Sequence, residues 1–168
     1  SSLGVAHGVT VEDIKNTILN NRDAKAVLII NPTYYGATSD LIEISNIVHE
    51  NHMLLLTDEA HGAHFYFNDR LPIGSMTIGT DLSAVSLHKT GGSLTQSSIL
   101  LSHRRNIDYY QMMKTIDLMQ TTSPSYLLLA SLDVSRYVLE TEGSKLLDEA
   151  IEIAQYGRKK INEIVGYY

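Results

Sequence analysis

Cysteine is absent from the 168-residue sequence, which excludes disulfide bonds and thiolate metal sites. Basic residues are few: 13 Lys and Arg stand against 19 Asp and Glu, for a formal net charge of -6. A nucleic-acid-binding surface needs clustered positive charge to neutralise phosphates, so this balance argues against one. The sequence also lacks an apolar run of roughly 18 residues and a signal-peptide layout. We therefore expect a cytoplasmic protein that binds neither nucleic acid nor membrane.

The residues that are present predict a folded α/β chain. Hydrophobic residues make up 43% and charged residues 19%, as is typical of a domain with one core. Thr10 with Asp13, and Ser39 or Asp40, are typical N-terminal caps of helices. From Asn106 onward the apolar spacing is helical. Short apolar runs predict four strands: Ala26–Ile30, Met53–Thr57, Leu82–Leu87 and Ser98–Leu101.

The order of these elements predicts the topology of the sheet. Continuously apolar strands separated by helices are typical of a parallel sheet. Only about ten residues link the third strand to the fourth, and a parallel crossover needs a dozen or more. We therefore predict a mostly parallel sheet with one antiparallel strand, helices on both faces and a helical C-terminal third. Ligands of such sheets bind at the carboxyl ends of the strands.

Three motifs follow three of the predicted strands and should meet at that edge: NPTYYG (31–36), DEAHGAH (58–64) and SLHKTGG (86–92). Lys89 carries the most chemistry, because a partly neutral lysine amine forms an imine with a carbonyl cofactor. Its neighbours offer hydroxyl, imidazole and backbone N–H groups suited to a phosphate: Ser86, His88, Gly91 and Gly92. Without them, a surface lysine on a turn would be the simpler interpretation.

Asp58 directly follows a buried strand, where a carboxylate needs a partner. A protonated ring nitrogen of a cofactor would serve, and so would the N-terminus of a following helix, and the sequence leaves both open. His61 and His64 could join Asp58 around a metal. However, the segment contains Gly62 and has no further histidine or cysteine nearby, so we expect no metal and expect His64 to pack against the following aromatic residues. The letters DEAH also occur in helicases, but no phosphate-binding loop accompanies them here.

The motifs together resemble a known family. NPTYYG, TDEAHGAHF and SAVSLHKTGGSLTQSS are similar to the major domain of bacterial ornithine/lysine/arginine decarboxylases, fold-type I pyridoxal-phosphate enzymes, from about Val9 to about Glu140. Aminotransferases of this fold often carry an arginine soon after the lysine, and residues 90–101 contain none, which favours the decarboxylases. Acid-induced members often have an aromatic residue at the position of His61, so the resemblance favours a biosynthetic member.

The resemblance implies roles for individual residues. Lys89 would form the Schiff base with pyridoxal phosphate, and Asp58 would pair with the pyridine nitrogen. Ser86 and His88 would contact the phosphate, and Ala60 or His61 would lie against the ring.

The resemblance also implies a substrate, a product and a larger protein. A basic amino acid (lysine, arginine or ornithine) would lose carbon dioxide and give a diamine or polyamine precursor, in a homodimer or higher homo-oligomer. Residues 1–168 would be a single partial domain, without the upstream phosphate loop or the C-terminal small domain. We therefore expect little activity from this chain alone. A fragment without cofactor, or an aminotransferase or lyase of the same fold, are the alternatives.

Overall fold

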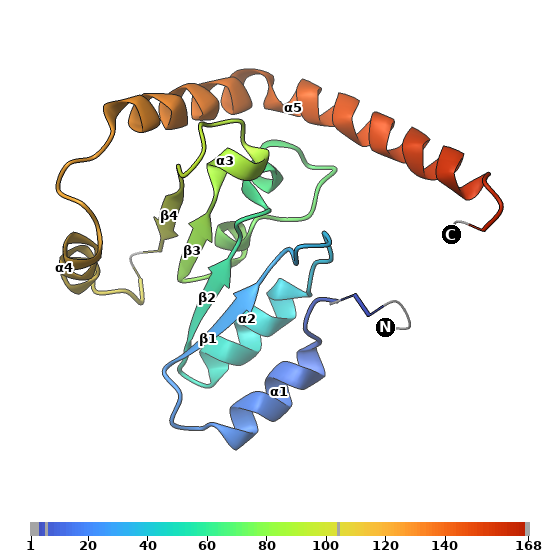
Figure 1. The fold of residues 1–168 in the computed structure, drawn as a ribbon. Coiled ribbons are helices and arrows are strands. Elements are labelled where there is room, and N and C mark those ends of the chain that lie inside the picture. The colour runs from blue at the N-terminus through green and yellow to red at the C-terminus, as the bar shows by residue number, and fades with distance from the viewer. Residues whose placement is uncertain (1–3, 6, 104, 167–168) are drawn as a thin grey trace.

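The computed structural model describes residues 4–5, 7–103 and 105–166, and Figure 1 shows their arrangement. A sheet occupies the centre, two helices lie along it, and a long helix crosses one of its edges. In chain order the elements are α1 (Val11–Asn20), β1 (Ala26–Ile30), α2 (Leu41–Glu50), β2 (Leu54–Asp58), the 3-10 helices η1 (Ala63–Phe67) and η2 (Ser75–Ile78), β3 (Leu82–Val85), α3 (Leu87–Thr90), β4 (Ile99–Ser102), α4 (Tyr109–Met119) and α5 (Tyr126–Asn162).

The predicted sheet topology is confirmed. The strands lie in the order β1-β2-β3-β4, the first three are parallel, and β4 pairs with β3 antiparallel. The predicted third strand was too long, because Ser86 already caps the short helix α3. Thr10 and Asp13 form a capping box at α1, and Asp40 caps α2 by accepting a hydrogen bond from the Glu43 amide.

One face of the sheet carries the main core. Helices α1 and α2 pack there with their apolar stripes, which meet inward-facing strand residues such as Ile29 and Leu55. Leu55, Ile44 and Val48 are fully buried. A smaller cluster continues the same face beneath the start of α5, where Ala63, Val85 and Leu87 contact partly buried Leu132. This layer fixes the strands and therefore the positions of their ends.

The opposite face of the sheet differs from the prediction of helices on both faces. Strand register places Leu28, Ile30, Ala84 and Leu100 on this face. Leu28 is 69% exposed and Ile30 57% exposed. Among the described residues no helix covers these side chains, so helical cover is confirmed for one face only. The physical reason is that α1, α2 and the start of α5 all pack on the side of Ile29, Leu55 and Val85.

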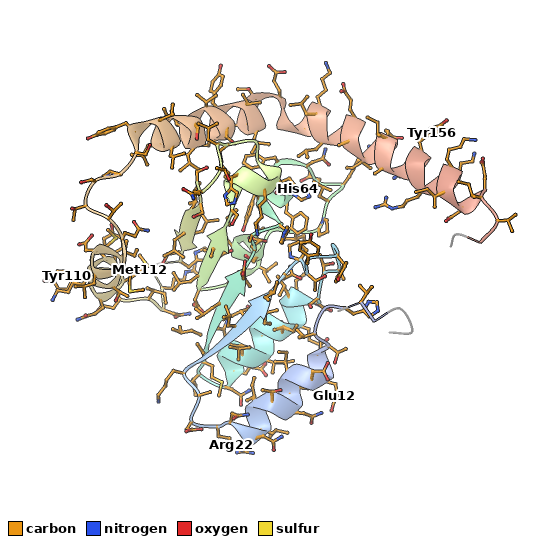
Figure 2. The ribbon with its side chains drawn as sticks, viewed as in Figure 1. Glu12, Arg22, His64, Tyr110, Met112 and Tyr156 are labelled. Carbon is orange, nitrogen blue, oxygen red and sulfur yellow. The ribbon has the colours of Figure 1, made fainter. Side chains whose placement is uncertain are left out.

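The helical C-terminal third is confirmed as two helices. Helix α4 has no buried residue and stands apart from the sheet, with Tyr110 and Met112 marking it in Figure 2. Helix α5 runs for 37 residues, and its buried residues all lie in the first half: Ser135, Leu139 and Gly143. Its second half, marked by Tyr156, extends away from the rest of the chain. Within the described ranges no helix is both long and apolar enough to cross a membrane.

Candidate cofactor site at the carboxyl edge

The carboxyl ends of β1, β2 and β3 lie side by side. Asp58, the last residue of β2, pairs in register with Ile30 on one side and Ala84 on the other. The ladder continues one step further, because the Asn31 amide donates to the Asp58 carbonyl at 2.9 Å. The motifs that begin at Asn31, Asp58 and Ser86 therefore start from one edge of one sheet, as the sequence predicted.

The Asp58 side chain lies on the uncovered face of the sheet, beside Ile30 and Ala84. Its Oδ1 accepts a hydrogen bond from the Ala60 amide at 3.0 Å, and no other described residue donates to this carboxylate. Asp58 does not cap a helix, because η1 begins at Ala63 and its cap is Gly62. Of the two interpretations that the sequence left open, the helix cap is excluded, and a carboxylate with acceptor capacity remains.

Lys89 lies in α3, the short helix that begins two residues after β3 ends. Its backbone amide donates to the Ser86 carbonyl at 3.1 Å, which fixes the turn. The side chain is exposed, and its amine has no hydrogen bond or ion pair with a described residue. The amine is therefore available to react. Its approach to Asp58 across the edge between β2 and β3 stays a prediction.

Ser86 and His88 flank this turn. Ser86 is half-buried at the N-cap of α3, and its hydroxyl makes no capping bond. The His88 Nδ1 lies 2.8 Å from the Ser97 carbonyl oxygen. Because a carbonyl only accepts, Nδ1 must carry the proton, and Nε2 can donate to an anion only when the ring is an imidazolium. The Ser86 hydroxyl is therefore the simpler of the two donors for a phosphate.

Helix α5 holds the glycine-rich loop that follows Lys89. The Ser135 hydroxyl donates to the Gly91 carbonyl, and the Leu94 amide donates to the Ser131 hydroxyl at 3.3 Å. The two serines are four residues apart and so share one face of the helix. Gly92, between these contacts, has φ +89, a conformation that favours glycine. The sequence analysis did not single out these serines, although two hydroxyls at helical spacing were a usable signal.

The two histidines of the DEAHGAH motif have different surroundings. The His61 ring lies edge-on to the Tyr34 ring at 5.5 Å, which joins the first two motifs. The His64 ring contacts Phe65 at 4.8 Å between centroids, so the predicted packing is confirmed. Burial lowers the pKa of His64. Figure 2 shows it close to α3 and beneath α5. In the described part of the chain, no three His, Asp or Glu side chains form a group that could hold a metal.

Glu59 is a residue that the sequence analysis missed. It is completely buried, and its carboxylate accepts hydrogen bonds from η1, η2 and β3. The alternation of side chains along β2 was the only available signal, because it places Glu59 opposite Asp58.

The donor set fits a ring cofactor that carries a carbonyl and a phosphate. An exposed amine at Lys89 can bind the carbonyl, and the Asp58 carboxylate can accept from a protonated ring nitrogen. The uncommitted Ser86 hydroxyl and the backbone around Gly92 suit the phosphate. A cavity of about 600 Å³ lies elsewhere, at the amino edge of the sheet, and its lining includes neither Lys89 nor Asp58.

Comparison with known proteins places the chain among relatives of one family. Residues 1–166 match the family described as Orn/Lys/Arg decarboxylase, major domain. An arginine decarboxylase of Bacillus subtilis (strain 168) is 45% identical over 168 residues, which is 100% of this chain and 34% of that protein. An arginine decarboxylase of Halalkalibacterium halodurans is 43% identical over 99% of this chain and 34% of its own length. The chain thus spans about a third of these curated relatives.

Solved structures show the same fold. The constitutive lysine decarboxylase of E. coli superposes with a TM-score of 0.70 at 22% identity, over 95% of this chain and 24% of that one. The apo form of mouse CSAD gives a TM-score of 0.67 at 19% identity, over 92% of this chain and 37% of that one. At these identities the likeness concerns the fold alone.

Proposed function

The chain belongs to the Orn/Lys/Arg decarboxylase family, and from this we propose that it forms the cofactor-binding centre of a pyridoxal-phosphate-dependent enzyme that decarboxylates a basic amino acid. Arginine is the first candidate substrate, because relatives that are 45% and 43% identical are named arginine decarboxylases. The observation that carries the proposal is that Asp58, a carboxylate with free acceptor capacity, ends β2, while Lys89, an amine without a partner among the described residues, follows the neighbouring strand β3.

Each residue of the site has a chemical task in this proposal. When bound, pyridoxal phosphate supplies an electron sink for the bond that breaks. The Asp58 carboxylate holds a proton on the ring nitrogen, because a negative charge close by favours the protonated form. Lys89 holds the cofactor through its amine and moves a proton at the reacting carbon. Ser86, and His88 when protonated, donate to the phosphate. Ala60 or His61 orients the ring from its side.

The test of the site uses the 168-residue chain. With pyridoxal phosphate and then borohydride, we expect a stable adduct that mass mapping places at Lys89. Lys89→Ala should abolish it. Lys114→Ala is the matched control, since Lys114 is also exposed but lies on α4 against Tyr110, away from the sheet. An adduct spread over several lysines, and unchanged by Lys89→Ala, would overturn the assignment.

The test of the reaction uses a chimera in which this chain replaces the matching third of the B. subtilis arginine decarboxylase. We expect carbon dioxide release from arginine, lysine or ornithine, with arginine the best substrate. Lys89→Ala should remove it, while the chain alone should show little turnover. A keto acid formed without carbon dioxide would instead indicate an aminotransferase.

A further inference from the structure

Two acidic residues in succession lie at the carboxyl end of β2, Asp58 as its last residue and Glu59 directly after it, and they point to opposite faces of the sheet. Asp58 lies on the uncovered face beside Ala84. Glu59 is 0% exposed and lies on the covered side. Its backbone still follows the ladder, since the Glu59 amide donates to the Ala84 carbonyl at 2.9 Å. The direction of one side chain therefore determines the direction of the other.

The Glu59 carboxylate is held by four donors. Oε1 accepts from the Ser75 amide at 2.8 Å, and Oε2 accepts from the Ser75 hydroxyl at 2.8 Å. The Ser83 hydroxyl at 3.1 Å and the Tyr66 hydroxyl at 2.5 Å complete the set. Ser75, Ser83 and Tyr66 belong to η2, β3 and η1, so three elements converge on one side chain. Such a saturated buried carboxylate has a single orientation.

The network contains no cation. None of the ion pairs between described residues includes Glu59. Burial raises the pKa of Tyr66, and its hydrogen bond to Glu59 raises the pKa further, so the phenol remains a donor. The carboxylate therefore depends on neutral donors with fixed geometry, and a change of its shape or hydrogen-bonding capacity must disturb all three elements.

Glu59 also supports the loop that carries Ala60 and His61. A Cβ added at Gly62 would lie 2.6 Å from the Glu59 Cγ, so the loop turns back directly over this side chain. The Gly62 amide donates to the Glu59 carbonyl at 2.9 Å and closes the turn. Within that turn, the Ala60 amide donates to the Asp58 carboxylate.

We propose that Glu59 is a positioning residue of the cofactor site: its buried carboxylate fixes the end of β2 so that Asp58 faces the ring nitrogen and His61 faces the ring. The importance of Asp58 and His61 rests on the proposed function. The mechanical link does not, because it joins Glu59 to the hydrogen bond between Ala60 and Asp58 in the chain without cofactor.

The test measures this link directly in the 168-residue chain. Glu59→Gln keeps the size of the side chain but places an amide NH₂ against donors. We expect hydrogen exchange of the Ala60 amide to accelerate by about tenfold, the loss expected when one hydrogen bond is released. Trapping of pyridoxal phosphate at Lys89 should fall by a similar factor, since misplacement by about 1 Å costs up to about a hundredfold.

Asp81→Asn is the control for simple destabilisation, because Asp81 is a buried carboxylate at the other end of the sheet. When the variant and the wild type are compared at the same folded fraction, Asp81→Asn should change neither the exchange rate of the Ala60 amide nor the trapping of pyridoxal phosphate at Lys89. Ser83→Ala removes one hydrogen-bond donor of Glu59 and should change both measurements less than Glu59→Gln does. It replaces Glu59→Gln in the test if that variant does not fold.

The outcomes separate this inference from the proposed function. If Asp58→Asn weakens trapping but Glu59→Gln and Ser83→Ala change neither readout, the inference is overturned and the function stands. If no variant and no wild-type chain traps the cofactor, Ala60 exchange alone decides the inference. Equal acceleration in Asp81→Asn would also overturn it, because the effect would then be general loosening of the chain.

Discussion

Two aspartates at opposite ends of the sheet show how differently one side chain can be used. Asp81 directly precedes β3 at the amino edge and is 1% exposed. It accepts hydrogen bonds from His49 at 2.9 Å, the Leu55 amide at 2.8 Å and Asn106 at 2.7 Å. Asp58 ends β2 at the carboxyl edge, is partly exposed, and accepts one bond from its own loop. A carboxylate saturated by the protein is structural, while one with free acceptor capacity is ready for a ligand.

The position of Asp81 explains why it is saturated. It joins the C-terminal end of α2, the start of β2 and the segment after β4, so three parts of the fold meet at one charge. Within the described residues, the Asp58 carboxylate accepts a hydrogen bond only from the Ala60 amide of its own turn. The carboxyl edge therefore retains polar groups that have no partner among the described residues. Such groups lower the stability of the fold, and the well-paired groups of the amino edge offset that loss.

The largest effect should come from replacing each of the two aspartates with alanine. Asp81→Ala leaves a buried amide, an amide side chain and an imidazole without their acceptor, so we expect a loss of about 3 kcal/mol or more in the free energy of unfolding. Asp58→Ala should cost less than about 1 kcal/mol, because only a local bond is lost. Urea unfolding of the 168-residue chain measures both. Similar losses would show that Asp58 is also structural.

The sequence predicted the arrangement of the strands but not the side-chain contacts that distinguish the two aspartates. The parallel strands, the antiparallel β4 and the shared edge of three motifs followed from apolar runs and link lengths. The partners of Asp81 could not be predicted, because His49 and Asn106 lie 32 and 25 residues away in sequence and meet only through the register of the sheet.

Two errors have the same origin. Helices were predicted on both faces because β1 is apolar throughout, yet Leu28 and Ile30 remain exposed among the described residues. The importance of Glu59 was missed because its donors, Tyr66, Ser75 and Ser83, belong to three separate elements. Local patterns in the sequence predict where strands and helices form and how the strands run, while long-range packing determines which groups each side chain contacts.

A smaller effect should appear when pH is varied. Burial by itself raises the pKa of Asp81, but hydrogen bonds from His49, Leu55 and Asn106 and the charge of His49 outweigh burial and leave the pKa below its usual value. As pH falls below about 4, the unfolded chain takes up a proton at this position before the folded chain does. The stabilisation by Asp81 is therefore complete above that pH and is lost as pH falls through the lower, folded pKa.

The measurement compares the wild-type chain with Asp81→Ala by urea unfolding at several pH values from about 7 to 3. The difference in the free energy of unfolding should shrink towards the acid end. Met53→Ala is the control, because it removes a buried apolar side chain of the same layer and has nothing to titrate. A constant difference for Asp81→Ala would show that its contribution comes from shape rather than charge.

The smallest effect should come from a carboxylate that has good donors but lies in water. Asp148 on α5 accepts from Asn68 at 3.1 Å and Arg70 at 3.0 Å, and these bonds lower its pKa, yet its side chain is 45% exposed. If hydrogen bonds alone decided the comparison, Asp148→Asn would destabilise the chain much as a change at Asp81 does. Because water and salt screen an exposed pair, we expect a much smaller loss, which fades as salt rises to about 1 M. Asp133→Asn, which removes an exposed ion pair within α5 itself, is the control, since it does not connect the helix to the segment after η1. A loss at Asp148 that persists in high salt would show that the attachment of α5 depends on the hydrogen bonds of this carboxylate rather than on its screened charge, and that burial matters less than the number of donors.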